Sequence, residues 1–121
     1  MDSVAALTAA LAVAQADRVV SPEEINVLER LCALEALDGW DAMALREQAG
    51  KAVDLDAALE AIQDDVDRGY ALALCFVMAL AGGITPPETA VLRRVAARWG
   101  FDDEALSACR REGQTLFERL L

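Results

Sequence analysis

The chain has 121 residues with 21 acidic and 11 basic side chains, which give a formal net charge of −10 at pH 7. Nucleic-acid backbones and anionic membrane surfaces repel such a polyanion, so we expect neither as a partner. The chain has no histidine, the commonest general base and a frequent metal ligand, and its apolar fraction of 55% excludes disorder over most of its length.

Two segments are continuously apolar, residues 4–16 and residues 70–84. The first ends in Ala14-Gln15-Ala16, which resembles a signal-peptidase site, but Asp2 precedes it and no Lys or Arg does, so we expect a core helix rather than a leader. The second is too short to cross a bilayer as a helix. Both segments are therefore predicted to be buried helices, without membrane insertion.

The first of these segments leads into Ser21-Pro22-Glu23-Glu24, a pattern typical of a helix start. A serine hydroxyl accepts hydrogen bonds from free N–H groups of the first turn, proline is tolerated at the first helical position, and Glu24 completes a capping box. Apolar residues follow at helical spacing. An amphipathic helix is predicted from Pro22, in which Glu23 and Glu24 stabilise the first turn.

The middle of the chain predicts two further helices. Asp41 is expected to cap one that runs to about Gln48, before the stop signal of Gly50. Asp54 is expected to cap another that runs from Leu55 to about Val66, with Leu55, Leu59, Ile62 and Val66 on one face. The next, apolar helix would then begin at Arg68 or Gly69.

Trp40 lies in the loop predicted before the first of these two helices, beside Gly39. Two interpretations are open: it anchors a binding partner, or it covers the core as a lid. The lid is the favoured interpretation.

A repeat with a period of 64 residues relates the two halves of the chain. Val20–Ala33 lies over Ile84–Ala97, so that Thr85, Pro86 and Glu88 repeat the helix-start pattern, and the register also places Asp38 on Asp102. Trp99 occupies a core position of the second copy. After it, Asp102 is expected to cap a last helix in which Gly113 introduces a bend or fraying.

These elements predict an all-α fold of about seven helices, in a single domain of residues 1–121. It is built from two related helix pairs at about 3–37 and about 70–101, and no strand pattern occurs. Cys32, Cys75 and Cys109 lie in apolar stretches without a CxxC spacing, so they are expected to be free core thiols in a reducing, cytoplasmic environment.

An Ala-rich helix, then Ala16-Asp17-Arg18-Val19-Val20-Ser21-Pro22-Glu23-Glu24, then an amphipathic helix resembles the TerB-like domain of tellurite-resistance proteins, over roughly residues 3–110. The resemblance implies a two-repeat, all-helical module of bacterial stress-response, defence or membrane-associated complexes, without a known catalytic activity. It also implies divalent-metal binding by acidic loop residues, of which Asp17 matches the family's Asp. Arg18-Val19 replaces the family's Gly-Glu, and Ala81 and Gly83 stand at the acidic positions of the second copy.

The densest acidic group is Asp64, Asp65 and Asp67. Hard cations require several convergent oxygens, and Asp64 and Asp67 could share a helix face, so these three residues and Asp17 are the candidate ligands for a divalent cation. Acids at a helix C-terminus oppose the helix dipole, which would make the group unfavourable and hint at a function. If Asp65 and Asp67 begin the next helix instead, their charge is favourable and the hint disappears.

Nothing in the sequence supports nucleophilic catalysis, because no histidine is available to pair with Ser or Cys. The leading hypothesis is a non-enzymatic interaction module that uses its acidic surface to bind a protein partner. The candidate contact residues are Glu23, Glu24, Trp40, Glu88 and Arg94. The alternatives are a divalent-metal-binding stress protein and an acidic inhibitor or immunity-type protein that masks a basic effector. The sequence leaves self-association open.

Overall fold

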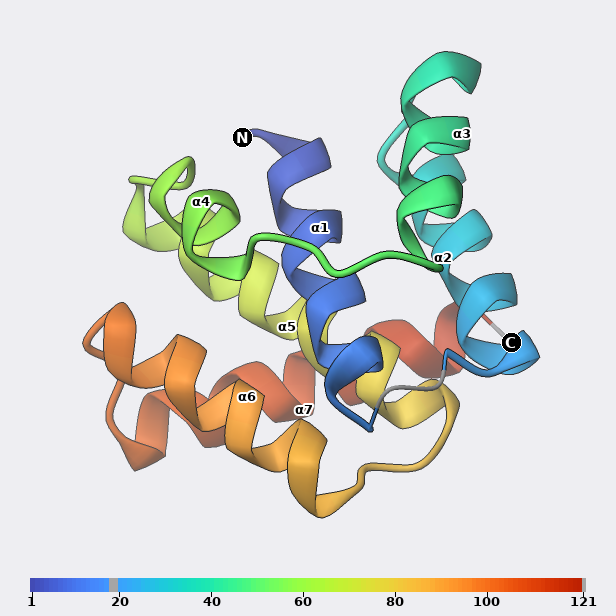
Figure 1. Ribbon diagram of the computed structural model, residues 1–121. Helices are drawn as coiled ribbons and strands as arrows, with labels where there is room; N and C mark the ends of the chain where they lie inside the picture. The colour runs from blue at the N-terminus through green and yellow to red at the C-terminus, as the bar shows by residue number, and fades with distance from the viewer. Residues whose placement is uncertain (18–19, 121) are drawn as a thin grey trace.

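A computed structural model of the chain describes residues 1–17 and 20–120, and this part is entirely helical (Figure 1). It contains no strand and consists of α1 (Ser3–Ala14), the 3₁₀ turn η1 (Gln15–Asp17), α2 (Pro22–Leu34), α3 (Gly39–Gln48), α4 (Leu55–Glu60), α5 (Asp65–Ala81), α6 (Pro86–Arg98) and α7 (Asp103–Leu120). The all-helical prediction with about seven helices is confirmed.

Helices α1 and α5 form the centre of the molecule and pack against each other, with the other helices around them (Figure 1). Residues 71–79 of α5 are all buried, and α1 is buried over most of its length. A helix that is apolar on all sides is stable in water only when other elements cover it completely. The prediction that both apolar segments are core helices is confirmed. No helix in the described ranges is both long enough and apolar enough to cross a bilayer.

Side chains cap the start of every α-helix in the part of the chain that the structure describes. The capping residues are Asp2, Ser21, Asp38, Asp54, Asp64, Thr85 and Asp102. Ser21 and Thr85 form complete capping boxes with Glu24 and Glu88, as the sequence predicts. Each cap accepts a hydrogen bond from a first-turn N–H that would otherwise have no partner in the helix.

Helices α2 and α6 also end alike. Ala36 has a φ of 54° and Gly100 a φ of 74°, and both lie two residues after the last helical residue. The next N–H reaches back in each case, from Leu37 to the Cys32 carbonyl at 3.0 Å and from Phe101 to the Ala96 carbonyl at 2.8 Å. This arrangement is the Schellman motif. The period of 64 residues therefore relates the ends of these helices as well as their starts.

The predicted start of α3 is wrong. Asp38 is the cap, its Oδ1 accepts a hydrogen bond from the Asp41 N–H at 2.8 Å, and the helix begins at Gly39. Asp41 thus lies inside the first turn, where a negative charge also suits the helix dipole. Trp40 lies in the same turn rather than in a loop, and 80% of it is exposed. The favoured interpretation of Trp40 as a lid on the core is wrong.

The cap of α4 is confirmed at Asp54, but the helix ends at Glu60 instead of Val66. The chain restarts at Asp64, whose Oδ2 accepts hydrogen bonds from the Val66 and Asp67 N–H groups at 3.0 and 3.1 Å. A single helix across residues 55–66 would leave this cap unused, and α5 begins at Asp65 rather than at Arg68 or Gly69. Val66 is consequently 79% exposed and does not share the buried face of Leu59 and Ile62.

Gly113 neither bends nor frays α7, contrary to the expectation from sequence. The helix continues through it to Leu120, and Gly113 is buried against α5. A Cβ at this position would lie 2.7 Å from the Ala73 carbonyl oxygen, so the glycine permits the close approach of the two backbones. The predicted burial of Trp99, which is 7% exposed, and of all three free cysteines is confirmed.

Candidate functional site

Two glutamates that the repeat places in equivalent positions are almost fully buried, Glu24 at 4% and Glu88 at 2% exposure. Glu24 Oε1 accepts a hydrogen bond from the Ser21 N–H at 2.9 Å. Glu88 Oε1 accepts from the Thr85 N–H at 2.9 Å and from the Thr85 hydroxyl at 3.0 Å. Both candidate contact residues thus expose little surface, and their first role is to cap their own helices. Glu23, between Pro22 and Glu24, is exposed.

Burial raises the pKa of Glu88 above the usual value of a glutamate, because the surrounding protein solvates its charge less well than water does. The hydrogen bonds from Thr85 lower the pKa, and the negative charges of Glu24 and Asp17 raise it. Glu24 and Asp17 therefore both act electrostatically on Glu88, and Asp17 lies in η1, which packs against α6. The structure brings Asp17 near Glu88 rather than into the Asp64 group.

One oxygen of this group stands out, since Glu24 Oε2 is buried and has no hydrogen-bond partner among the described residues. Gly82, the C-cap of α5, lies directly against the Glu24 side chain. A Cβ on Gly82 would lie 3.3 Å from Glu24 Cδ and 3.4 Å from its Oε1. A buried acceptor without a partner costs free energy and requires an explanation, such as a water molecule or an ion.

The acidic group at residues 64–67 forms the start of α5. Asp64 is the N-cap, and Asp65 and Asp67 follow in the first turn, where negative charge is favourable. Asp65 pairs with Arg68 at 3.9 Å, and Asp67 pairs with the N-terminal ammonium group at 3.9 Å. The capping of α5 and the favourable charge in its first turn thus account for this acidic group without a ligand. This is the alternative in which Asp65 and Asp67 begin the next helix.

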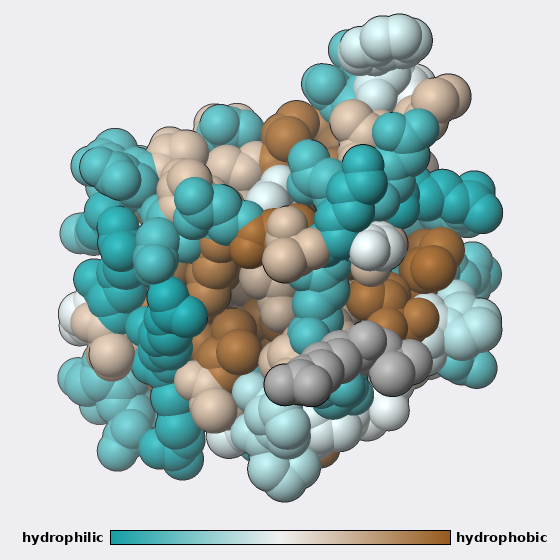
Figure 2. All heavy atoms as spheres, viewed as in Figure 1, coloured by the Kyte–Doolittle hydropathy of each residue, from teal (hydrophilic) through white to brown (hydrophobic). Residues whose placement is uncertain are grey.

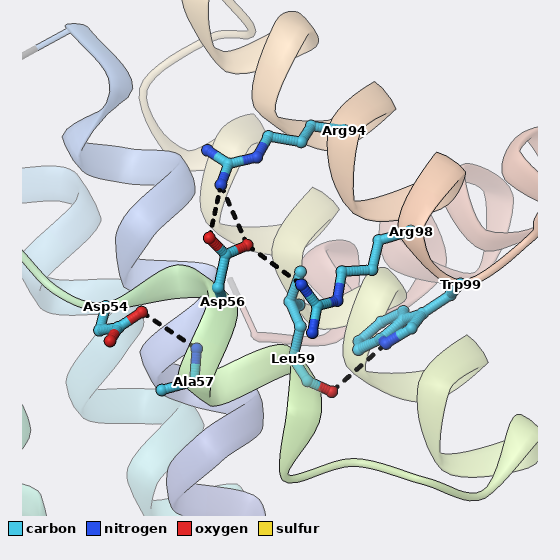
Figure 3. Close-up of polar contacts among 7 residues, drawn as sticks. All are labelled: Asp54, Asp56, Ala57, Leu59, Arg94, Arg98 and Trp99. Carbon is cyan, nitrogen blue, oxygen red and sulfur yellow. Dashed lines mark hydrogen bonds and ion pairs between the residues drawn. The ribbon is translucent and has the colours of Figure 1, made fainter.

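Arg94, another candidate contact residue, holds α6 against α4. Its Nη2 lies 3.0 Å from both carboxylate oxygens of Asp56, and Arg98 Nη1 lies 3.4 Å from Asp56 Oδ1 (Figure 3). Trp99 donates a hydrogen bond from its indole nitrogen to the Leu59 carbonyl at 3.4 Å, next to these ion pairs. No role for Asp56 follows from the sequence, because nothing local indicates that two arginines of a distant helix converge on it.

Helix α3 exposes two large apolar side chains on one side. Trp40 is 80% exposed and Met43, three residues later, is 57% exposed. Residues three apart are neighbours on a helix surface, and together with Glu47 they line a shallow hollow of about 190 Å³. A second hollow of about 240 Å³ on the other side of Met43 is lined by Leu28, Glu29, Cys32, Ala42 and Arg46. We call Trp40, Met43 and these two hollows the α3 face.

Acidic groups border the α3 face. Glu29 lines the second hollow and is paired with Arg46 at 2.8 Å. Asp41 and Glu47 form no ion pair with any residue that the structure describes. Met43 is not among the residues predicted to contact a partner, although its spacing of three residues from Trp40 indicates that the two side chains are neighbours on the helix surface.

The α3 face is exposed because α3 lies at the periphery, whereas α7, which follows the equivalent cap in the second copy, packs along α5 (Figure 1). Leu45 is the one fully buried side chain that α3 contributes. Exposed apolar side chains that lie together on a small protein mark sites where partners bind.

Residues 2–111 match the family described as Tellurite resistance protein TerB. The chain belongs to the TerB family. Searches among curated proteins and among solved structures return no match. The resemblance expected from the helix-start motif is thereby confirmed, and the match extends from the first residues of α1 into α7.

Membership of the TerB family raises the question of whether the residues present fit a divalent cation. Glu24 Oε2 is an oxygen donor without a described partner, and Asp17 lies near enough to Glu88 to raise its pKa. However, within residues 1–17 and 20–120 no group of three or more Cys, Asp or Glu side chains is placed to hold a metal ion. The described residues therefore offer one buried oxygen donor without a partner but no assembled ligand set.

Proposed function

We propose that this TerB-family chain is a non-enzymatic interaction module of the bacterial cytosol, in a stress-response or defence system, that binds a protein partner through the α3 face. The observation that carries the proposal is the 80% exposure of Trp40 beside Met43. Tryptophan and methionine are enriched in the buried centres of protein interfaces and are costly to leave in water. The most exposed of the two tryptophans thus lies where a partner could cover it.

The chemistry of the α3 face suggests what the partner carries. Its hollows accept apolar side chains. Asp41, Glu47 and the net charge of −10 favour a partner that carries basic side chains around its apolar contact residues. A helix with an apolar stripe flanked by Lys and Arg meets both requirements. An acidic inhibitor that masks a basic effector would use the same chemistry, with a tighter and more salt-sensitive complex.

The test is a titration of the ¹⁵N-labelled protein with a synthetic amphipathic helix of Leu and Lys, followed by NMR. We expect saturable shifts in α3 and its neighbours in α2, lost in Trp40→Ala and in Met43→Ala. Val66→Ala is the matched control, because Val66 is as exposed as Trp40, at 79%, but lies at the start of α5. Shifts that spread evenly over all acidic surfaces, or that survive in both α3 variants, would contradict docking on this face.

The second candidate is a divalent-metal-binding stress protein, favoured by one observation, the unpartnered Glu24 Oε2. The test compares thermal stability in EDTA with stability in millimolar calcium, magnesium, manganese or zinc. A ligand that binds only the folded state raises stability by about 2.7 kcal/mol at a hundred times its dissociation constant. A shift lost in Asp17→Asn would place the ion beside Glu24 and Glu88, and one lost in Asp64→Asn would place it at the start of α5. No shift with any cation would leave protein docking as the function.

A further inference from the structure

A cavity of about 470 Å³ opens between the end of α1, the segment that joins α3 to α4, and α6. Figure 2 shows this face of the molecule hollowed beside that segment, with apolar side chains in the recess and hydrophilic ones around it. Val20, Val53, Leu55 and Val91 provide apolar walls, and Lys51 and Arg94 provide cationic groups. The volume falls in the range of pockets that bind small organic molecules.

The charged side chains that line this cavity are basic, although Asp56 pairs with Arg94 and Asp54 lines the neighbouring hollow that Lys51 also lines. The chain carries 21 acidic and 11 basic residues, yet no acidic residue lines the cavity among those described. The hollows of the α3 face, by contrast, are lined by Glu29 and Glu47. Lys51 forms no ion pair with any residue in the described ranges. The cavity is therefore suited to an anion, although the protein as a whole is not.

Hydrogen bonds made by lining residues hold the walls of the cavity in place. The Gln15 side-chain amide donates hydrogen bonds to the carbonyls of Gln48 at 2.9 Å, Ala49 at 3.3 Å and Lys51 at 2.6 Å, which fixes the segment against the end of α1. Asp56 binds Arg94 through Nη2 alone, and the other two guanidinium nitrogens of Arg94 have no partner among the described residues (Figure 3). Arg94 is thus oriented by one carboxylate and retains donors for a second.

We propose that this cavity binds a small organic monocarboxylate with an apolar body. The carboxylate would lie between Lys51 and Arg94, because guanidinium groups match carboxylate geometry and charge-assisted hydrogen bonds are the stronger ones. The hydrocarbon part would pack on the valine and leucine walls. A bare inorganic anion would leave these walls in water, and a neutral ligand would leave Lys51 without a counter-charge and the remaining donors of Arg94 unused, so each fits the cavity less well.

The probe is sodium octanoate, titrated into the ¹⁵N-labelled protein at low ionic strength and followed by NMR. We expect saturable shifts confined to the amides of residues 49–55 and 91–94, with a dissociation constant of about 1 mM for a ligand of this size. Octan-1-ol and octylamine test whether the carboxylate is recognised, and phosphate tests whether the apolar body is needed. Each should bind about tenfold more weakly than octanoate.

Two substitutions should remove recognition of the carboxylate, Lys51→Gln and Arg94→Gln, each weakening octanoate binding about tenfold. Arg98→Gln is the matched control, because Arg98 also pairs with Asp56 but does not line the cavity. Val91→Phe should block the cavity without removing a charge. All variants are first checked for an unchanged fold by their NMR spectra. The proposal is overturned if no saturable shift occurs at the cavity, if octan-1-ol binds as tightly as octanoate, or if Arg98→Gln weakens binding as much as Arg94→Gln.

Discussion

Gly113 of α7 lies so close to Ala73 of α5 that a Cβ on Gly113 would come within 2.7 Å of the Ala73 carbonyl oxygen. The same Cβ would lie 2.8 Å from Phe76 Cβ. One obstacle is backbone and the other is the first atom of a side chain, so neither can rotate away. The contact between the two longest helices of the molecule therefore depends on the absence of a single methyl group.

We expect Gly113→Ala to lower the free energy of unfolding by about 2–3 kcal/mol, because overpacking a closely fitted interface forces the backbones apart. Gly69→Ala is the control. Gly69 lies inside α5 and a Cβ there meets nothing within 4 Å, so the change should stabilise the protein by about 0.5–1 kcal/mol through the lower backbone entropy of alanine in the unfolded chain. Urea denaturation measures both, and equal effects of the same sign would contradict the close approach.

Ala36 adopts the left-handed conformation that Gly100 adopts 64 residues later. An L-residue pays about 1–2 kcal/mol for this conformation, which glycine adopts without strain. We expect Ala36→Gly to raise the free energy of unfolding by about 0.5–1 kcal/mol and Gly100→Ala to lower it by about 1 kcal/mol. Thermal or urea unfolding of the pair provides the measurement, and a loss of stability in Ala36→Gly would be the contrary result.

Glu88 makes folding stability depend on pH. Its pKa is raised in the folded state by burial, so its contribution to stability is complete below the unfolded pKa of about 4.5 and is lost as pH rises through the folded pKa. Glu88→Gln cannot ionise and retains an oxygen for the Thr85 donors. We expect the variant to gain stability relative to the parent as pH rises above about 4.5, by about 1.4 kcal/mol for each unit by which the pKa is raised.

Urea denaturation of Glu88→Gln and the parent at a series of pH values from acid to neutral measures this difference. A difference that stays constant, or that changes in favour of the parent, would show that burial does not dominate at Glu88. Direct titration of the Glu88 carboxyl carbon by NMR gives the pKa independently.

Trp40 should dominate fluorescence quenching. It is 80% exposed and Trp99 is 7% exposed, so acrylamide should quench the parent strongly and Trp40→Phe weakly. Because Glu47 lines the same hollow as Trp40 and the net charge is −10, the caesium cation should quench it more efficiently than iodide at low ionic strength, and the preference should shrink in salt. A blue-shifted, unquenched Trp40 would show that it is covered, for example by self-association through the α3 face.

Local chemistry made the starts of α2 and α6 predictable. Ser21 and Thr85 contact N–H groups three residues away, so their capping boxes depend on neighbours in sequence alone. The predicted start of α3 was wrong because Asp38 and Asp41 are both possible caps within four residues. The internal repeat distinguishes them. Asp38 corresponds to Asp102, which caps α7 in the same way, at 2.8 Å from the Ala105 N–H.

The candidate site was less predictable, because its features depend on where helices pack. Asp56 and Arg94, which it orients, are 38 residues apart. Lys51 and Val91 are also distant in sequence, and they line the same cavity only because the helices pack as they do. The exposure of Trp40 depends on α3 lying at the edge of the bundle, which no pattern within α3 indicates. The role of Gly113 was unpredictable for the same reason, since its obstacle belongs to another helix.

The N-caps have a consequence for how the chain tolerates change. Each described α-helix carries the signal for its own beginning, and five of these seven signals are aspartates placed directly before the helix. An insertion or deletion between helices therefore moves the cap together with the helix behind it and leaves the hydrophobic register of that helix intact. Connections such as residues 49–54 can vary in length and composition while the bundle is preserved, so the walls of a binding cavity can change faster than the core that supports them.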